Sequence, residues 1–247
     1  MTSLPFKNIL LLYKRSAYKI YFLDNKYSLF KHNRSLTKKE LKRFQDAHDE
    51  HYASLKAITR VLFTLGIPFT ECYRGHDIDY SKYDLIITVG GDGTFLEASR
   101  QSQNQVIIGI NSAPNHSVGR FCLGTVDHFS HIINKIQKRK YEIALFHRLQ
   151  LKVDSNPELL SSLNDILICH SNPAVLCRYY VNIKNIIEEQ RSSGIWISTP
   201  AGSSGAIHSA GGKILNQYSK QFQYLPRELY LGKNEGYKLK GGVLSSN

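Results

Sequence analysis

Residues 85–94 read LIITVGGDGT, and this stretch decides the fold of the N-terminal half of the chain. A run over residues 85–89 that is apolar except for Thr88 stops at the glycine-rich residues 90–94, and a helix-compatible segment, FLEASRQSQ, follows. A buried strand that leads through such a turn into a helix N-terminus is suited to binding phosphate, because glycines let the backbone approach a ligand closely. Asp92 stands among the glycines, and phosphates repel a carboxylate unless it holds a metal ion or takes a proton. The motif therefore predicts chemistry as well as binding.

Other glycine-rich motifs fit this stretch less well. The P-loop pattern GxxxxGK[ST] occurs nowhere in the chain, and the dinucleotide pattern GxGxxG, counted from Gly91, fails at Leu96. A simpler alternative is a tight turn in which Asp92 caps the helix. The sequence GGDGT also resembles the nucleotide site shared by NAD kinases, diacylglycerol and sphingosine kinases and, more loosely, phosphofructokinases. Taken alone, this resemblance implies a kinase that acts on a hydroxyl group.

Composition favours anionic ligands. The 247 residues can form one large domain or two small ones, and 32 Lys+Arg against 20 Asp+Glu give a formal net charge of +12. The basic runs are short, namely Lys38-Lys39 and residues 135–140, so we expect nucleotides rather than nucleic acid as partners.

The chain has no sequence feature of a secreted or membrane protein. Its four cysteines form no CxxC pair, which argues against a zinc or redox motif. The stretch NILLLY (residues 8–13) is too short for a signal sequence, and no apolar run approaches the ~20 residues of a membrane span. We expect a reduced, cytoplasmic protein with no membrane partner.

The N-terminal half alternates strand-like and helix-like segments. The run at residues 8–13 and the segments PFTECY, LIITV and VIIGIN (106–111) read as strands. A helical pattern runs from Ser35 to Gly66, with Thr37 and Glu40 spaced as a capping box and Gly66 as the residue that ends the helix. This alternation predicts a Rossmann-like α/β domain with a parallel sheet over residues 1–125. Ligands of such sheets bind at the carboxyl ends of the strands, where GGDGT and Asn111 lie.

The pattern changes after residue 125. One helical segment, DHFSHIINKIQKR, precedes several alternating, strand-like runs, of which GIWIST (194–199) is the last. This predicts a second, β-rich domain over residues 126–247.

A tract of small residues follows that last strand. Residues 191–212 read RSSGIWISTPAGSSGAIHSAGG. Such residues let backbone or ligand approach closely, and the hydroxyls of Ser203, Ser204 and Ser209 can hydrogen-bond ribose, adenine or phosphate. A flexible linker is the alternative, although the apolar strand just upstream argues against it.

Together these motifs resemble the NAD kinase family. GGDGT, Asn164-Asp165 and GIWISTPAGSSGAIHSAGG occur in the family's order and at similar separations, and QFQYLPREL (221–229) also resembles the family. The stretch NPAVLCRYYV is similar to a divergent branch that includes NADH-preferring and mitochondrial-type members. The resemblance implies an N-terminal α/β domain and a C-terminal β-sandwich-like domain of the kind shared with diacylglycerol kinases. It also implies transfer of the γ-phosphate of ATP to the 2′-hydroxyl of the adenosine ribose of NAD or NADH.

The resemblance further implies residue roles. Asp92 would be the base that takes the 2′-hydroxyl proton, and Asn164 and Asp165 would bind adenine and ribose. Mg²⁺ or another divalent cation would come with ATP, with no protein ligand assigned except Asp92. Homodimers or homotetramers would be expected. The other implied nucleotide-binding residues are Gly90, Gly91, Gly93, Thr94, Arg191, Ser193, Thr199, Gly202, Ser203, Ser204, Gly205 and Ser209.

The sequence departs from the family pattern at several positions. Asp165 replaces Glu, Ser193 replaces Asp, Ser204 replaces Thr and Ala206 replaces Tyr. The chain ends at Asn247, so we expect a short C-terminal domain. These departures leave the preference for NAD or NADH open. The short C-terminus and the missing Tyr keep an inactive dinucleotide-binding regulator in view as one alternative. GGDGT and the positive charge keep a second alternative, a lipid or sphingoid-base kinase.

Overall fold

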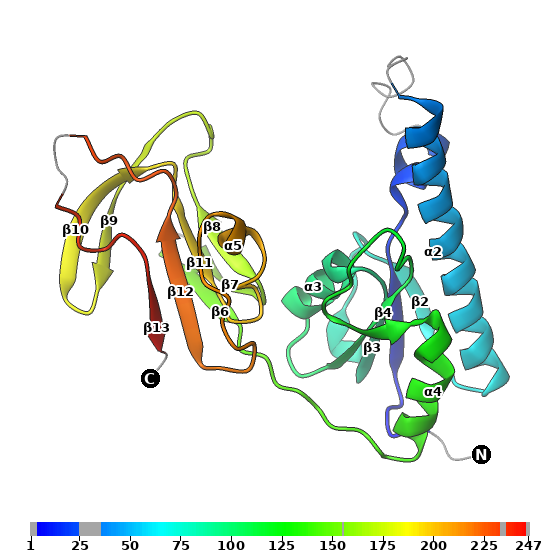
Figure 1. The fold of residues 1–247 in the computed structure, drawn as a ribbon. Coiled ribbons are helices and arrows are strands. Elements are labelled where there is room, and N and C mark those ends of the chain that lie inside the picture. The colour runs from blue at the N-terminus through cyan, green and yellow to red at the C-terminus, as the bar shows by residue number, and fades with distance from the viewer. Residues whose placement is uncertain (1–3, 25–35, 155, 233–235, 246–247) are drawn as a thin grey trace. The chain divides into compact units, whose positions relative to one another are not determined.

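The computed structural model describes residues 4–24, 36–154, 156–232 and 236–245. The chain divides into two compact units, Met1–Ile143 and Ala144–Asn247 (Figure 1). Each unit has its own sheets and its own hydrophobic core.

Unit 1 is built on a five-stranded parallel sheet in the order β2-β1-β3-β4-β5. The predicted parallel α/β sheet is therefore confirmed. Strand β3 lies at the centre and is buried along its whole length, as its mostly apolar sequence predicts. The strands are β1 (Ile9–Tyr13), β2 (Thr70–Tyr73), β3 (Leu85–Gly90), β4 (Val106–Asn111) and β5 (Cys122–Thr125).

Among the described residues, three α-helices accompany this sheet: α2 (Lys38–Thr64), α3 (Asp92–Gln101) and α4 (Val126–Gln137). The predicted capping box is confirmed, because Thr37 Oγ1 accepts the Glu40 N–H at 3.2 Å while Glu40 accepts the Thr37 N–H at 2.7 Å. Gly66 follows α2 with a φ of +65°, which suits a glycine after a helix. Ser35 lies outside the described residues. The described part of the unit also contains two short helical turns, η1 (Lys19–Leu23) and η2 (Tyr80–Lys82).

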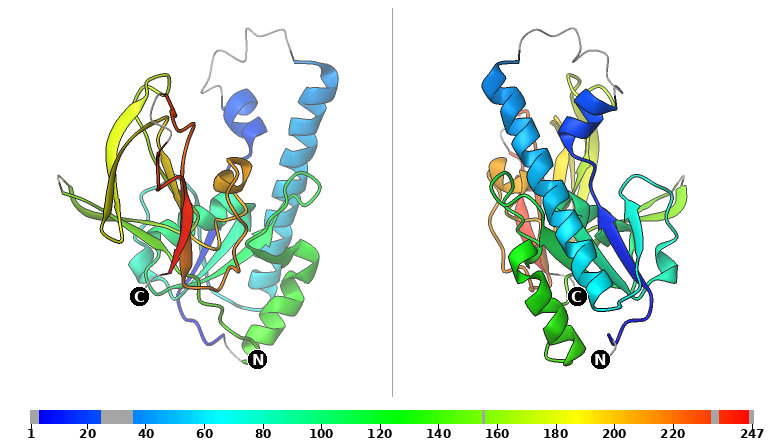
Figure 2. Two further views of the ribbon diagram at one scale, coloured as in Figure 1. Left: turned by 60° about the vertical axis from the view of Figure 1, so that its left-hand side comes forward. Right: turned by 90° about the vertical axis from the view of Figure 1, so that its right-hand side faces the viewer.

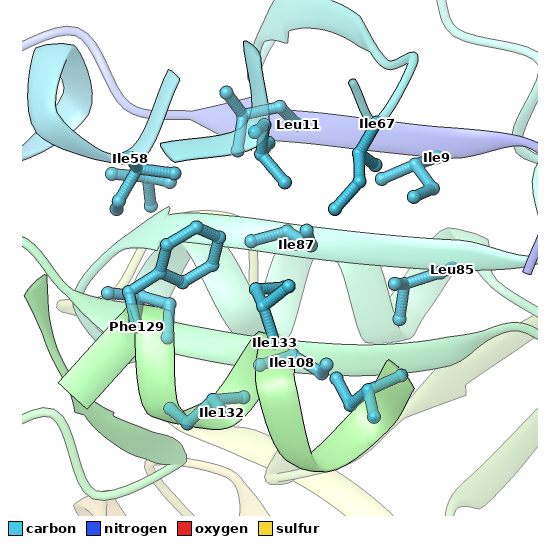
Figure 3. Packing of buried hydrophobic residues seen from close by; sticks show 14 of the residues in the cluster. Ile9, Leu11, Ile58, Ile67, Leu85, Ile87, Ile108, Phe129, Ile132 and Ile133 are labelled. Carbon is cyan, nitrogen blue, oxygen red and sulfur yellow. The ribbon is translucent and has the colours of Figure 1, made fainter. Parts of the chain in front are cut away.

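Helices α2 and α4 lie side by side over one face of the sheet (Figure 2). Ile58 of α2 and Phe129 and Ile133 of α4 pack there against Leu11 and Ile87 of the strands (Figure 3). All five side chains are fully buried, and each such burial contributes about 1.5–3 kcal/mol relative to exposure. Helix α3 covers the other face through Ala98, which packs with Leu10, Leu12 and Ile86.

Helix α4 therefore belongs to the first unit, whereas we expected it to open the second domain after residue 125. Its buried positions, Phe129, Ile132, Ile133 and Ile136, form one helical stripe that lies in the core of the parallel sheet. The division between the compact units follows this helix, between Ile143 and Ala144.

Unit 2 is β-rich, as predicted, and its strand pairs are antiparallel. A four-stranded sheet has the order β13-β12-β11-β8, and two hairpins, β6–β7 and β9–β10, accompany it. Val181 of the β9–β10 hairpin packs with Ile195 and Tyr224 of the larger sheet. The strands are β6 (Leu149–Val153), β7 (Asn156–Ser162), β8 (Asp165–Ile168), β9 (Cys177–Ile183), β10 (Ile186–Ser192), β11 (Ile195–Ser198), β12 (Gln221–Pro226) and β13 (Gly242–Ser245), with the short helix α5 (Ala206–Ser209).

No helix in the described part of the chain is both long and apolar enough to cross a membrane.

Candidate nucleotide-binding sites

The GGDGT turn lies at the carboxyl edge of the parallel sheet. Gly90 ends β3 directly opposite Asn111, the last residue of β4, and the Ser112 N–H donates to Gly90 O at 3.1 Å. The sequence placed GGDGT and Asn111 at this edge, and the strand register brings them together.

Two glycines of the turn lie close to neighbouring side chains. The Thr94 side chain occupies the space that a Cβ at Gly90 would need, with Thr94 Cβ 2.9 Å from that position. A Cβ at Gly93 would lie 3.0 Å from the Arg74 guanidinium nitrogen Nη1. A side chain at Gly90 would therefore displace the first turn of α3, whereas one at Gly93 would require only the flexible end of Arg74 to shift.

Asp92 is the first residue of α3 and not its cap. The N-cap is Gly91, which has no side chain to bond the helix N–H groups. Asp92 instead accepts the backbone N–H of Phe121 on Oδ1, at 2.8 Å. Within the described residues no hydrogen bond engages Oδ2. The carboxylate is thus held in one orientation at the positive end of a helix, with one oxygen available.

The segment that supplies the Phe121 N–H is held by Asn111. Asn111 Oδ1 accepts the Ser117 hydroxyl at 2.8 Å, and Nδ2 donates to Ser117 O at 2.9 Å. The Phe121 ring stacks on Phe95 of α3, with centroids 5.3 Å apart. Asn111 therefore contributes to the site by positioning the partner of Asp92.

A buried histidine, which the sequence did not single out, supports the same edge. His51 Nε2 lies 2.7 Å from Lys14 O and Nδ1 lies 2.7 Å from Ser112 Oγ. A carbonyl can only accept, so Nε2 carries the proton and the Ser112 hydroxyl donates to Nδ1. Burial, reinforced by the Lys14 charge, lowers the pKa of His51 to about 4. His51 is therefore neutral and ties α2 to the ends of β1 and β4.

Three further groups at this edge were missed. Burial and the nearby Asp92 raise the pKa of the Cys122 thiol to about 12, so this thiol stays protonated. Lys14 and Arg74 directly follow β1 and β2. The sequence offered one clue to Lys14 and Arg74, because each directly follows a predicted strand, as GGDGT directly follows the strand LIITV.

In unit 2, Asn164 and Asp165 lie beside the start of the small-residue tract. Asp165 opens β8 opposite Ser198 of β11, and the Thr199 N–H donates to Asn164 O at 2.9 Å. A Cβ at Gly202 would lie 2.5 Å from Asn164 Cα, so only glycine allows this approach. The structure thus brings together two motifs that are well separated in the sequence.

The two side chains carry unmatched oxygens. Asn164 Oδ1 and Asp165 Oδ2 are buried and have no hydrogen-bond partner among the described residues. Both side chains lie near Gly205, whose missing Cβ would be 3.7 Å from Asp165 Oδ2 and 3.8 Å from Asn164 Nδ2. Burial raises the pKa of Asp165, and the nearby N–H groups of Ala206 and Ile207 oppose that rise. Buried acceptors are normally satisfied, so this pair suits a ligand that offers O–H or N–H donors.

The hydroxyls of the tract divide into two groups. Thr199 Oγ1 donates to Leu163 O and accepts the Gly202 N–H at 2.9 Å. Ser203 Oγ donates to Pro200 O at 2.7 Å and accepts the Leu215 N–H at 2.9 Å. These two side chains are buried and shape the tract. Ser204 is half-buried and Ser209 is exposed.

Arg191 and Ser193 do not lie with Asn164, Asp165 and the small-residue tract. Arg191 is exposed on β10 opposite Arg178, and the Ser193 N–H donates to Arg227 O at 2.9 Å. Ser193 precedes β11 whereas Thr199 follows it, and a rise of ~3.3 Å per residue separates them by roughly 20 Å.

The model of the ATP-NAD kinase N-terminal domain matches residues 13–141, more than half of the chain. The chain belongs to the NAD kinase family. It is 31% identical over 175 residues to a probable NADH kinase from Oryza sativa subsp. japonica, covering 62% of this chain and 52% of the relative. The NADH kinase of Arabidopsis thaliana is 36% identical over 168 residues, 59% of this chain and 53% of the relative. The NAD kinase of Methanothermobacter thermautotrophicus is 31% identical over 155 residues, 62% of this chain and 53% of the relative. The chain thus spans about half the length of these curated relatives.

Solved structures agree with the fold of the family. An NAD kinase from Archaeoglobus fulgidus in complex with ATP superposes with a TM-score of 0.66 at 19% identity, covering 96% of this chain and 77% of that one. Yeast NADH kinase complexed with NADH superposes with a TM-score of 0.65 at 15% identity, covering 98% of this chain and 70% of that one. At these identities the likeness establishes the fold.

Proposed function

We propose that this member of the NAD kinase family transfers the γ-phosphate of ATP to the 2′-hydroxyl of the adenosine ribose of NAD or NADH. The observation that carries the proposal is the Asp92 carboxylate, oriented by the Phe121 N–H at the glycine-rich end of a buried strand. Relatives whose names specify NAD or NADH kinases support the substrate, and the structures of related kinases with ATP and with NADH support the two ligands.

In the proposed reaction Asp92 is the general base. A ribose hydroxyl is a weak nucleophile and needs a base within about 2.6–3.2 Å in the productive pose. As the 2′-oxygen bonds to the γ-phosphorus, its proton passes to Asp92 and the bond to the β,γ-bridging oxygen breaks, which releases ADP. The backbone of Gly90, Gly91, Gly93 and Thr94 and the N-terminus of α3 would bind phosphate oxygens.

The adenosine half of the dinucleotide would bind to unit 2. Ribose hydroxyls and the adenine amino group are donors, and Asn164 Oδ1 and Asp165 Oδ2 are buried acceptors without partners among the described residues. Ser204 and Ser209 would add hydroxyls, while Gly202 and Gly205 would admit the ligand and Thr199 and Ser203 hold the tract in shape.

A divalent cation such as Mg²⁺ would enter with ATP. The described residues contain no cluster of three or more His, Cys, Asp or Glu side chains suited to a metal. Mg²⁺ usually keeps several waters and binds one or two carboxylates together with substrate phosphates. Because the one available oxygen of Asp92 is the proposed base, Asp92 would hold such an ion through a bound water. The ion would neutralise charge on the phosphates.

We further propose that the protein belongs to the NADH-preferring branch. The names of the rice and Arabidopsis relatives support this preference. Ser193 replaces a carboxylate of the family pattern, and a carboxylate would favour the positively charged, oxidised nicotinamide ring over the neutral, reduced ring. Arg191 and Ser193 lie apart from the adenosine group, as residues that meet the other end of an extended dinucleotide would. The family resemblance also supports a homodimer or homotetramer, which light scattering would test.

The decisive test is product formation. The full chain is incubated with ATP, Mg²⁺ and either NAD or NADH, and NADP(H) is measured by chromatography. We expect NADP(H) to accumulate, more rapidly from NADH. Tight NADP(H) binding without turnover would instead identify a dinucleotide-binding regulator, and phosphorylation of a lipid extract would identify a lipid or sphingoid-base kinase.

A further inference from the structure

Two cations lie beside the GGDGT turn at the carboxyl edge of the sheet. The Arg74 N–H, just after β2, donates to Tyr13 O at 2.8 Å, and the Lys14 N–H, just after β1, donates to Val89 O at 3.3 Å. Because β1 lies between β2 and β3, Arg74, Lys14 and Gly90 occupy neighbouring positions along this edge.

Both cations belong to the face of the sheet that α3 covers. Side chains alternate along extended strands, and Leu12 and Cys72 pack on the α3 side of the sheet. Lys14 and Arg74 each stand two residues beyond these positions and so share that side. The position of the Arg74 guanidinium agrees, because Arg74 Nη1 lies 3.0 Å from the place that a Cβ on Gly93 would take.

Of these two cations, Arg74 has an acidic partner and Lys14 has none among the described residues. Glu97 lies 3.9 Å from Arg74 Nε and also accepts the Gly75 N–H at 3.0 Å, so it orients Arg74 with Nη1 toward Gly93. Lys14 forms no ion pair among the described residues. Burial and the Arg74 charge lower the pKa of Lys14, while Glu50 opposes that effect. Glu50 itself accepts a hydrogen bond from Asn115 at 2.9 Å.

Two further observations indicate that an anion completes this arrangement. Like charges held close together and partly removed from water are unfavourable unless an anion joins them. In addition, Thr94 Oγ1 in the first turn of α3 is buried without a hydrogen-bond partner in the described part of the chain, although the residue is only 1% exposed. The positive end of α3 adds to the attraction for negative charge.

We propose that Lys14 and Arg74, together with the first turn of α3, form a subsite for a phosphate group of a nucleotide substrate. This inference rests on the proposed function only for the identity of that nucleotide. The phosphate can come from the triphosphate of ATP or from the diphosphate of NAD(H), since both offer oxygens to an ammonium and a guanidinium.

The test measures binding of tripolyphosphate, ATP and NADH to the full chain by calorimetry. In Lys14→Met and in Arg74→Gln we expect a loss of about ten-fold or more in affinity for tripolyphosphate and for the nucleotide whose phosphate occupies the subsite. Lys42→Gln removes an exposed charge from α2 and should change nothing. A loss confined to ATP assigns the subsite to the donor, and a loss confined to NADH assigns it to the dinucleotide.

Two outcomes overturn the subsite: wild-type protein that binds none of the three probes, or both variants binding all of them as the wild type does. If Lys14→Met does not fold, Lys14→Arg should retain affinity, and Arg74→Gln, whose side chain is 39% exposed, still decides. Loss of binding in the variants of a wild-type protein that forms no NADP(H) would leave the subsite standing and overturn only the proposed function.

Discussion

The backbone N–H of Phe121 donates a 2.8 Å hydrogen bond to Oδ1 of Asp92, 29 residues earlier in the chain. This bond orients the carboxylate without a second charged group, because a backbone N–H contributes no net charge. The oxygen that remains can face a substrate hydroxyl at the positive end of α3.

Asp92→Asn removes the ability of this side chain to take a proton but keeps the hydrogen bond that orients it. The amide oxygen can still accept the Phe121 N–H, but the side chain can no longer take a proton, so NADP(H) formation should fall by about 10²–10⁴-fold. The melting temperature should change little. Asp77→Asn, in an exposed loop of the same unit, should match the wild type in both measurements. Near-normal turnover of Asp92→Asn would reject Asp92 as the base.

His51 should make stability depend on pH. Its pKa is lowered from 6.5 to about 4 in the folded protein, so the neutral ring stabilises the fold fully above pH 6.5 and protonation removes that contribution as the pH falls to about 4. The difference corresponds to roughly 3 kcal/mol of unfolding free energy. Urea unfolding of wild type and His51→Leu across this range measures it. The variant should be less stable at neutral pH and lose less on acidification, and equal pH slopes would contradict the assignment.

Much of the α/β fold could be predicted because the stretch before GGDGT, apolar except for Thr88, has few structural alternatives in a chain of this size. The sequence could not show where α4 packs, since a stripe such as Phe129, Ile132 and Ile133 tells that a helix buries one face but not against which sheet. The Phe121 partner of Asp92 was equally hidden, because any residue except proline offers a backbone N–H. Lys14 and Arg74 were visible only as residues after strands, and the strand order made them neighbours.

Gly202→Ala should disrupt the junction between β8 and the small-residue tract. The added Cβ would lie 2.5 Å from Asn164 Cα, and the backbone on both sides is held by hydrogen bonds. We expect a loss of about 1–3 kcal/mol or more in unfolding free energy, together with weaker NADPH binding. Gly236→Ala, where a Cβ meets nothing within 4 Å, is the matched control. Equal melting temperatures for the two variants would show that the tract can shift without cost.

Ser193→Asp tests the basis of the proposed NADH preference. Restoring a carboxylate should raise the ratio of kcat/KM for NAD to that for NADH, by about three- to ten-fold at a site partly open to solvent. Ser171→Asp adds the same charge to an exposed loop of the same unit and should leave the ratio unchanged. A ratio that moves equally in both variants would point to the overall charge of the protein instead.

Asp165→Asn distinguishes a ligand-binding carboxylate from a structural one. Burial raises the pKa of Asp165, and the N–H groups of Ala206 and Ile207 oppose that rise. A neutral amide of the same shape, whose oxygen can still accept an N–H, should therefore change the unfolding free energy little. If Asp165 accepts a hydroxyl of the ribose, KM for the dinucleotide should rise about ten-fold while kcat changes much less, because the contact is made equally in ground and transition states. Asp154→Asn, at an exposed turn of the same unit, should leave both constants unchanged. A lower melting temperature with an unchanged KM would place Asp165 in the architecture of β8 rather than in the adenosine site.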